Sequence, residues 1–179
     1  QCTVDGGFFV AGLTKSFGEG SSDVWIIRAN QAGDTLWTRT FGGPGFDMAF
    51  CVSRTSDNGF AVVGRAQPSG LDYGNLWILR MDSLGDTLWA RSYGGKGYDV
   101  GTFVQQSSDG DLLITGSTNS YGSGSYDLWL LRLNSKGDTL WTQTFGGSAS
   151  DFGFCVRELK NRDLIVAGAT QSYGAGDAD

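Results

Sequence analysis

Three aspartates recur at a fixed spacing of 52 residues along the chain, at Asp47, Asp99 and Asp151. Carboxylates that converge from successive repeats could bind a cation, or could act in pairs as they do in glycoside hydrolysis. Alternatively, each aspartate could cap the turn before a strand through a local hydrogen bond to the backbone. Catalytic sites are usually asymmetric, so the return of the aspartate in every copy favours the structural interpretation.

Three arginines follow the same spacing, and each lies inside an apolar run: Arg28, Arg80 and Arg132. A charged side chain in an apolar strand needs a partner, or must extend its charged end to solvent. The sequence therefore predicts that each arginine forms an ion pair with a repeated aspartate. Binding of an anionic ligand by these arginines is the alternative.

Glycine-rich loops that contain an aromatic residue return in one phase of the repeat, at residues 16–20, 120–124 and 172–176. An aromatic ring beside glycines could hold a sugar or form part of a Ca²⁺ site, and the same residues could simply form a turn. The spaced acidic ligands of a strong calcium loop, D-x-D-x-D-G, are absent from the sequence. The sequence predicts no cofactor and leaves Ca²⁺ and a glycan open as ligands.

Composition limits the chemistry further. Histidine is absent from the 179 residues, which removes the commonest general base and the commonest metal ligand. The formal net charge is −6 and no basic cluster is present, which argues against nucleic acid or an anionic membrane as a partner. No apolar run approaches the ~20 residues that a membrane-spanning helix needs. We therefore expect no enzymatic activity, no nucleic-acid partner and no membrane span.

Two of the three cysteines, Cys51 and Cys155, occupy the same position of the repeat. The copy between them has Phe103 at that position, so we expect a buried apolar site that holds free thiols. A disulfide bridge or a reactive thiol is the alternative. Cys2 lies in a different phase of the repeat.

A single repeat of 52 residues positions all of these side chains. The segment GDTLW returns at residues 33–37, 85–89 and 137–141. We divide the single domain 1–179 into repeats 5–56, 57–108 and 109–160, and a partial repeat 161–179. A fixed period of this length is typical of a propeller or an array built from one supersecondary unit. All six tryptophans follow the period, in two series: Trp25, Trp77 and Trp129, and Trp37, Trp89 and Trp141.

One complete repeat predicts four short strands, A to D, at residues 100–105, 112–115, 128–133 and 139–145. Turns that contain glycine separate the strands, and no segment carries the apolar spacing of a helix. Strand C is apolar at successive positions, which indicates that both faces of its sheet are covered. Strand D is more mixed, as expected of an outer strand, and we expect the tryptophan series that begins at Trp37 to fix it to the neighbouring unit.

The segment D-S-L-G-D-T-L-W at residues 82–89 resembles the tryptophan-docking motif of quinoprotein-type propellers, in which Asp, Gly and Trp recur at this spacing between the third and fourth strands. The whole unit, with D-G-G-F before strand B and W-x-x-x-F/Y-G-G at its end, is also similar to repeats of secreted bacterial and archaeal propeller proteins. The resemblance covers essentially the entire chain. It implies an all-β fold, a β-propeller-type array of four-stranded antiparallel blades, located outside the cell, secreted or at its surface. It carries over no cofactor, because no residue constellation for a quinone matches.

The two ends of the chain are out of phase with each other. Residues 1–4 align with the end of strand A, and Asp179 aligns with Asp127, just before strand C. Gln1 in place of Met, with no visible signal peptide, also indicates a processed or truncated chain. We therefore expect a fragment of a larger protein, or ends that are completed by other copies of the chain and could extend into a fibre.

The sequence thus predicts a non-catalytic extracellular structural or interaction module, with the rest of a longer chain or other copies of itself as partner. Two alternatives stay open. One is a carbohydrate- or calcium-binding lectin-like propeller. The other is a propeller enzyme such as a glycosidase.

Overall fold

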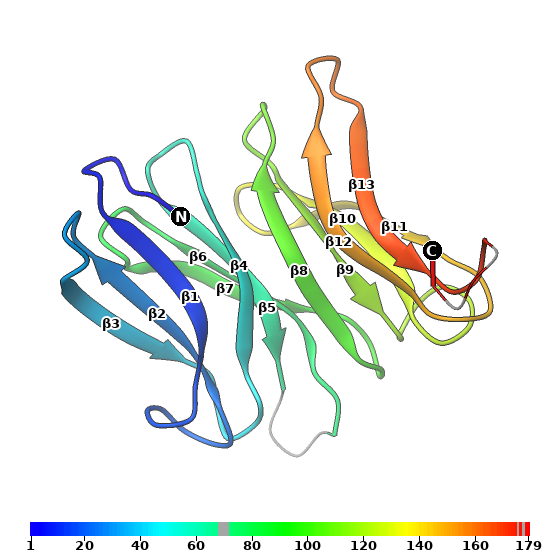
Figure 1. Cartoon of the computed structure of the whole chain (residues 1–179), viewed down its shortest axis with the longest axis horizontal. Coiled ribbons are helices and arrows are strands. Elements are labelled where there is room, and N and C mark those ends of the chain that lie inside the picture. The colour runs from blue at the N-terminus through cyan, green and yellow to red at the C-terminus, as the bar shows by residue number, and fades with distance from the viewer. Residues whose placement is uncertain (68–71, 175, 177) are drawn as a thin grey trace.

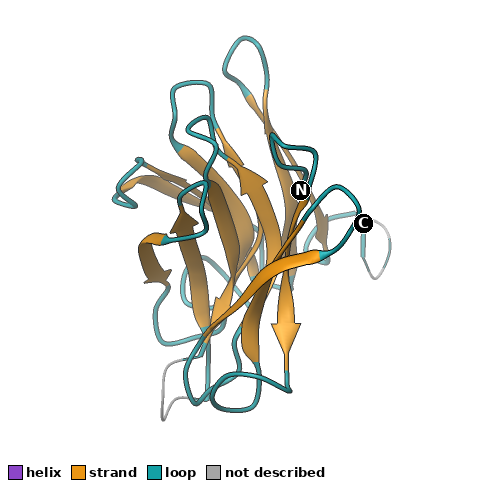
Figure 2. Ribbon diagram, turned by 90° about the vertical axis from the view of Figure 1, so that its left-hand side faces the viewer, coloured by secondary structure: helices purple, strands orange, loops and turns teal. Residues whose placement is uncertain are grey.

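The computed structural model describes residues 1–67, 72–174, 176, 178 and 179. These residues form strands and loops without a helix (Figure 2). Thirteen strands are present in this part of the chain, and they form antiparallel sheets of two to four strands. The expected all-β class and antiparallel strand order are therefore confirmed. Residues 68–71 of the second predicted repeat, and residues 175 and 177 of the partial repeat, lie outside the described residues.

The strands follow one another along each sheet in chain order, so every connection within a sheet is a hairpin. The first sheet has β1 (Phe8–Thr14), β2 (Asp23–Ala29) and β3 (Thr35–Phe41). The second has β4 (Met48–Arg54), β5 (Phe60–Ala66), β6 (Asn75–Met81) and β7 (Thr87–Tyr93). The third has β8 (Asp99–Gln106), β9 (Leu112–Thr118), β10 (Asp127–Leu133) and β11 (Thr139–Phe145). The fourth has β12 (Asp151–Glu158) and β13 (Leu164–Thr170).

The observed strands agree closely with the predicted unit. Strand D is observed at the predicted residues, Thr139–Phe145, and strand A is one residue longer at each end. Strand C begins one residue earlier, at Asp127, and strand B continues three residues further, to Thr118. Strand B is longer because Thr118 still pairs across to Asp127, so the hairpin between β9 and β10 stays regular up to the glycine-rich loop.

The four sheets lie side by side in chain order (Figure 1). Strand β4 packs against β1 and β2, strand β8 against β4, β5 and β6, and strand β12 against β8, β9 and β10. The first strand of the second, third and fourth sheets therefore lies on the face of the sheet before it. At the first junction, the Phe9 ring stacks on Phe60 with 3.9 Å between ring centroids.

This arrangement explains the continuous apolar runs. In β6, Ile78 points to the cluster between the second and third sheets, while Leu79 points to the cluster between the first and second. Both side chains are fully buried. Because the second sheet is covered on both faces, its third strand has no side exposed to water, and apolar residues at successive positions are favoured.

The last strands of the first and second sheets, β3 and β7, are partly exposed, and each is fixed to the next sheet by its tryptophan. Trp89 of β7 donates a hydrogen bond through Nε1 to the carbonyl of Ser135, at 3.0 Å, in the turn between β10 and β11. Trp37 of β3 lies against the equivalent turn of the second sheet, where a Cβ at Gly85 would come within 2.3 Å of the indole ring. Gly85 also has a positive φ of 84°, so both the backbone conformation and the contact with the indole ring favour glycine at this position.

The other tryptophan series lies nearer the core. Trp129 of β10 is buried and belongs to the cluster between the second and third sheets. Trp77 is half-buried and packs against the cluster between the first and second sheets. Trp25 is half-buried, and its ring centroid lies 6.2 Å from that of Phe17 in the first glycine-rich loop.

Replacing Trp89 with alanine is expected to lower the free energy of unfolding by about 2–4 kcal/mol, because a half-buried aromatic contact and its hydrogen bond to the next sheet are both lost. Trp141→Ala is the matched control, because Trp141 has the same position in the repeat and also packs against the next sheet, but the two strands described for that sheet offer it no equivalent turn. Urea unfolding of both variants measures the difference. Equal losses for the two variants would show that docking onto the next turn does not stabilise the fold.

Candidate functional site

Asp99, the central member of the aspartate series, is fully buried at the first position of β8. Its Oδ2 accepts hydrogen bonds from the backbone N–H of Gly95, at 2.9 Å, and from the hydroxyl of Ser120, at 2.7 Å. Its Oδ1 accepts a hydrogen bond from the hydroxyl of Thr118. One carboxylate thus joins the Gly-Gly turn before the inner strand to the end of the second strand of the same sheet.

Asp47 and Asp151 are also buried and make equivalent contacts. Asp47 accepts hydrogen bonds from the N–H of Gly43 and of Gln67, and Asp151 accepts them from the N–H of Gly147 and the hydroxyl of Ser172. Burial raises the pKa of Asp151, but these hydrogen bonds outweigh burial and leave the pKa below its ordinary value. The geometry is that of a turn cap. Ligand binding by the three aspartates stays a prediction.

A second buried carboxylate accompanies two of these caps and was not among the residues predicted from the sequence. Asp23 and Asp127 begin β2 and β10. A Cβ at Gly42 would lie 2.2 Å from Oδ1 of Asp23 and 2.7 Å from Oδ2 of Asp47, so the two carboxylates close on one glycine. The signal was available, because Asp23, Asn75, Asp127 and Asp179 also recur every 52 residues.

The environment of Asp23 opposes ionisation. Burial raises the pKa of Asp23, the neighbouring charges of Asp47 and Glu19 raise it further, and a hydrogen bond from the backbone of Glu19 acts in the other direction. Within the described residues, no group of three or more His, Cys, Asp or Glu side chains is arranged to hold a metal ion. The pairs contribute two carboxylates each, and Ca²⁺ binding stays a prediction.

Each arginine of the repeat series pairs with an aspartate at one repeat position, as predicted. Arg28 contacts Asp5 at 2.6 Å, and Arg80 contacts Asp57 at 2.5 Å. Arg132 contacts Asp109 at 2.6 Å and also Asp111 at 2.8 Å. The first two guanidinium groups also donate to the carbonyl of the residue that follows each of them, Ala29 and Met81. These ion pairs and hydrogen bonds compensate the positive charge of each guanidinium group and explain why an apolar strand tolerates an arginine.

Each of the three junctions between sheets contains a groove. The groove between the second and third sheets encloses about 510 Å³ and runs from the end of β7 to β10 and β11. The equivalent groove between the first and second sheets encloses about 580 Å³. We name the groove between the second and third sheets the junction groove. Its lining consists of Ser92, Tyr93, Gly94, Tyr121, Trp129, Leu131, Thr139, Thr142, Gln143 and Thr144.

Aromatic rings form the fixed part of the junction groove. The ring of Tyr121, from the second glycine-rich loop, lies 5.5 Å from that of Trp129, and its hydroxyl donates to the carbonyl of Gly94 at 2.9 Å. The hydroxyl of Tyr93 donates to the carbonyl of Gly137 at 2.6 Å. Burial raises the pKa of Tyr93 to about 12, so its hydroxyl stays protonated as a donor. Of the third glycine-rich loop, residue 175 lies outside the described residues.

The expected buried position of Cys51 and Cys155 is half-buried, and all three thiols are free. Burial raises the pKa of Cys51, which disfavours the reactive thiolate form.

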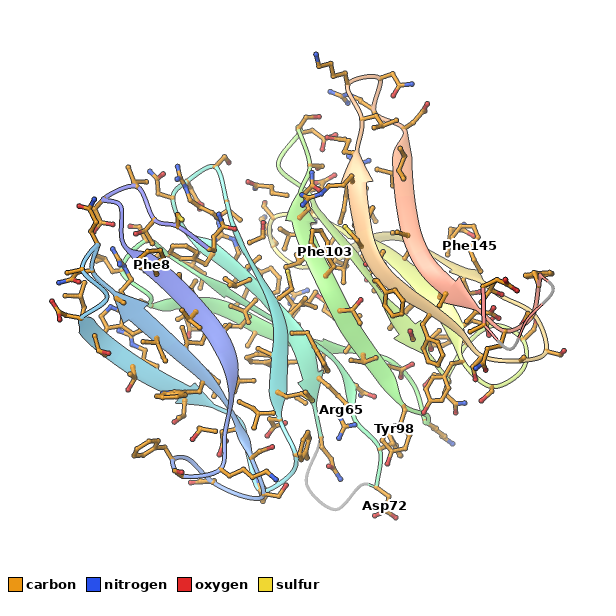
Figure 3. All side chains as sticks on the ribbon, viewed as in Figure 1. Phe8, Arg65, Asp72, Tyr98, Phe103 and Phe145 are labelled. Carbon is orange, nitrogen blue, oxygen red and sulfur yellow. The ribbon has the colours of Figure 1, made fainter. Side chains whose placement is uncertain are left out.

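Arg65 is a further charged side chain that the repeat did not predict. Its guanidinium lies 5.1 Å from the Phe46 ring and 5.4 Å from the Tyr98 ring, and Figure 3 shows it beside Tyr98. No repeat signal could have revealed it, because leucine, serine and alanine occupy its equivalent positions.

Asp99→Ala is expected to lower the free energy of unfolding by about 3 kcal/mol, because one turn N–H and two hydroxyl groups lose a charged acceptor. Asp86→Ala is the control, since its exposed ion pair with Arg39 contributes less than about 1 kcal/mol. Chemical unfolding at neutral pH measures both. If Asp99→Ala is no more destabilising than the control, the carboxylate is not a structural cap.

The Arg80–Asp57 pair predicts a pH dependence. Burial raises the pKa of Asp57, but hydrogen bonds from Thr55, Gly59 and Arg80 together with the charge of Arg80 hold it below its ordinary value. Folding therefore gains stability from this carboxylate above the ordinary pKa, and loses it as the pH falls below about 4. Asp57→Asn is expected to flatten the acid limb of a stability curve measured by urea unfolding. Asp34→Asn, which lacks an arginine partner in the described part of the chain, should leave the curve unchanged. An unchanged acid limb in Asp57→Asn would contradict the assignment.

Comparison with known proteins finds a similar region in the Regulatory protein FlaEY of Caulobacter vibrioides, which is 31% identical over 140 residues. The match covers 70% of this chain but only 14% of that protein, so the chain spans a small part of the relative. No protein-family model matches the chain. Among the described residues, no helix has the length and apolar character needed to cross a membrane.

Proposed function

We propose that the chain is an arc of a β-propeller and serves as a non-catalytic structural or interaction module outside the cell. Each sheet is one blade, and the inner strand of each blade lies on the face of the blade before it. The repeat resembles those of secreted propeller proteins, which supports the proposed location. The similar region of FlaEY belongs to a much longer protein, which supports a role within a larger array.

One observation carries the interaction role, namely that repeat-equivalent side chains are buried at the junctions and exposed at the two end faces. Phe60 and Val62 are 2% and 0% exposed on the second sheet, whereas their equivalents Phe8 and Val10 on the first sheet are 40% and 48% exposed. At the other end, Ile165 is 56% exposed and its equivalent Leu113 is fully buried. Figure 3 shows Phe8 on the outermost sheet.

The two end faces therefore expose the apolar side chains that are buried where two blades pack together. A further blade of the same repeat is the partner that fits them, because each junction within the chain already joins two such faces. The blade could come from the remainder of a longer chain or from another copy. Head-to-tail addition that does not close would extend the array into a fibre. FlaEY is named a regulatory protein, and regulation through protein contacts is compatible with such a module.

The non-catalytic part of the proposal rests on the engagement of the repeated ionisable side chains. Both oxygens of each of Asp47, Asp99 and Asp151 accept hydrogen bonds, and the repeated arginines pair with aspartates. A general acid or base must instead reach a substrate proton. Turnover of a polysaccharide that Asp99→Asn abolishes would overturn this proposal and favour the glycosidase alternative.

Sedimentation of the purified chain over a range of concentrations tests the interaction role. We expect association that Val10→Arg or Ile165→Arg abolishes, because each places a charge on one end face. Equimolar Val10→Arg and Ile165→Arg chains should form a dimer that grows no further, since each retains one intact face. Leu88→Arg is the matched control, because this leucine and its equivalents Leu36 and Leu140 are exposed in every repeat. A chain that stays monomeric at all concentrations, or a Leu88→Arg variant equally impaired, would contradict the proposal.

A further inference from the structure

The junction groove combines aromatic rings with hydroxyl and amide groups and has no charged side chain among its described lining residues. Trp129 and Leu131 form its buried floor. Ser92, Thr139 and Gln143 stand at its exposed side and carry groups that both donate and accept hydrogen bonds. A ligand that fits this surface is therefore uncharged, has an apolar face and carries several hydroxyl groups.

Tyr121 gives the groove a preformed wall. The residue is 49% exposed, and its ring is tilted by 47° against that of Trp129, so it offers aromatic surface to a ligand beside the tryptophan. The hydrogen bond from its hydroxyl to the carbonyl of Gly94 ties the loop to the end of the second sheet. The Trp129 indole is fixed by donation of its Nε1–H to the Thr142 hydroxyl. Because these side chains are already held in place, binding a ligand costs little additional ordering.

We propose that the junction groove binds a neutral saccharide. The apolar C–H face of a sugar ring can lie against Tyr121, and its hydroxyl groups can exchange hydrogen bonds with Ser92, Gln143 and the groove's threonines. A charged ligand would find no opposite charge among the described lining residues, and the chain's net charge of −6 repels an anion. A purely apolar ligand would leave the hydroxyl groups without partners.

The junction groove adjoins the groove between the first and second sheets, which favours a saccharide chain over a single sugar. Ser92 also lines the groove between the first and second sheets, together with Phe41 and Trp77. Phe41 and Trp77 hold the repeat positions of Tyr93 and Trp129 in the junction groove. Since one serine borders both grooves, a linear oligosaccharide can occupy them in succession and gain affinity from the linkage. The proposal goes beyond the structural role, because it needs only junctions within the chain and no completion of the end faces.

Titration of the purified chain with neutral hexasaccharides tests the proposal: cellohexaose, xylohexaose, mannohexaose and hexa-N-acetylchitohexaose. Calorimetry and tryptophan fluorescence should detect binding of at least one of them, more tightly than its disaccharide. Tyr121→Ala should weaken that binding at least about tenfold, because the stacking wall is removed. Tyr173→Ala is the matched control, since Tyr173 occupies the same repeat position and donates to the carbonyl of Gly146 at 3.0 Å.

Tyr173 borders a groove of the fourth sheet in which no tryptophan is found among the described lining residues, so its removal should change the affinity less than about twofold. Circular dichroism of both variants checks that they are folded. The proposal is overturned if none of the four saccharides binds, if anionic polygalacturonate binds more tightly than all of them, or if the two tyrosine variants lose affinity equally. Because these results are independent of chain association, failure here leaves the end-face proposal untouched.

Discussion

The packing of each inner strand on the face of the preceding sheet is the interaction on which the rest of the structure depends. A sheet of four short strands with two apolar faces cannot be stable alone in water, so each sheet needs a neighbour on both sides. The continuous apolar strand that contains Ile78 and Leu79 is the direct consequence, since those two side chains enter different clusters. The polar side chains are then restricted to turns, strand ends and the outer strands.

Polar contacts set the geometry of this stack. The aspartates Asp47, Asp99 and Asp151 hold the Gly-Gly turns through which the chain crosses to the next sheet. The tryptophans of β3 and β7 lie on a turn of the sheet that follows. The two contacts act at opposite sides of a junction. Together with the face-to-face packing they fix how each sheet follows the last, which explains why no residue is inserted or deleted between the complete copies.

The sequence was sufficient to predict the strands, their order and the arginine–aspartate pairs, because each of these features is local or repeated. Arg80 and Asp57 could be matched since both follow the same period and only a paired charge is tolerated in that strand. The second carboxylate at Asp23 was missed, because its approach to Asp47 depends on how the strand end meets the next turn. The junction groove was missed for a similar reason, since its walls come from two different sheets and a loop.

Positions at which the copies of the repeat differ distinguish side chains that maintain the fold from side chains that could recognise a ligand at one junction. Asn75 takes the place of Asp23 and Asp127 beside Asp99, so the second carboxylate is dispensable for the junction, whereas the capping aspartate is retained at all three junctions. Tyr121 and Tyr173 share a repeat position and donate to the carbonyls of Gly94 and Gly146, but among the described lining residues only Tyr121 stands in a groove with a tryptophan, Trp129. The scaffold is therefore set by what every copy keeps. Individual recognition must reside in the side chains by which one junction differs from the next, and among the described lining residues the combination of Tyr121 with Trp129 distinguishes the junction groove from the grooves at the other two junctions.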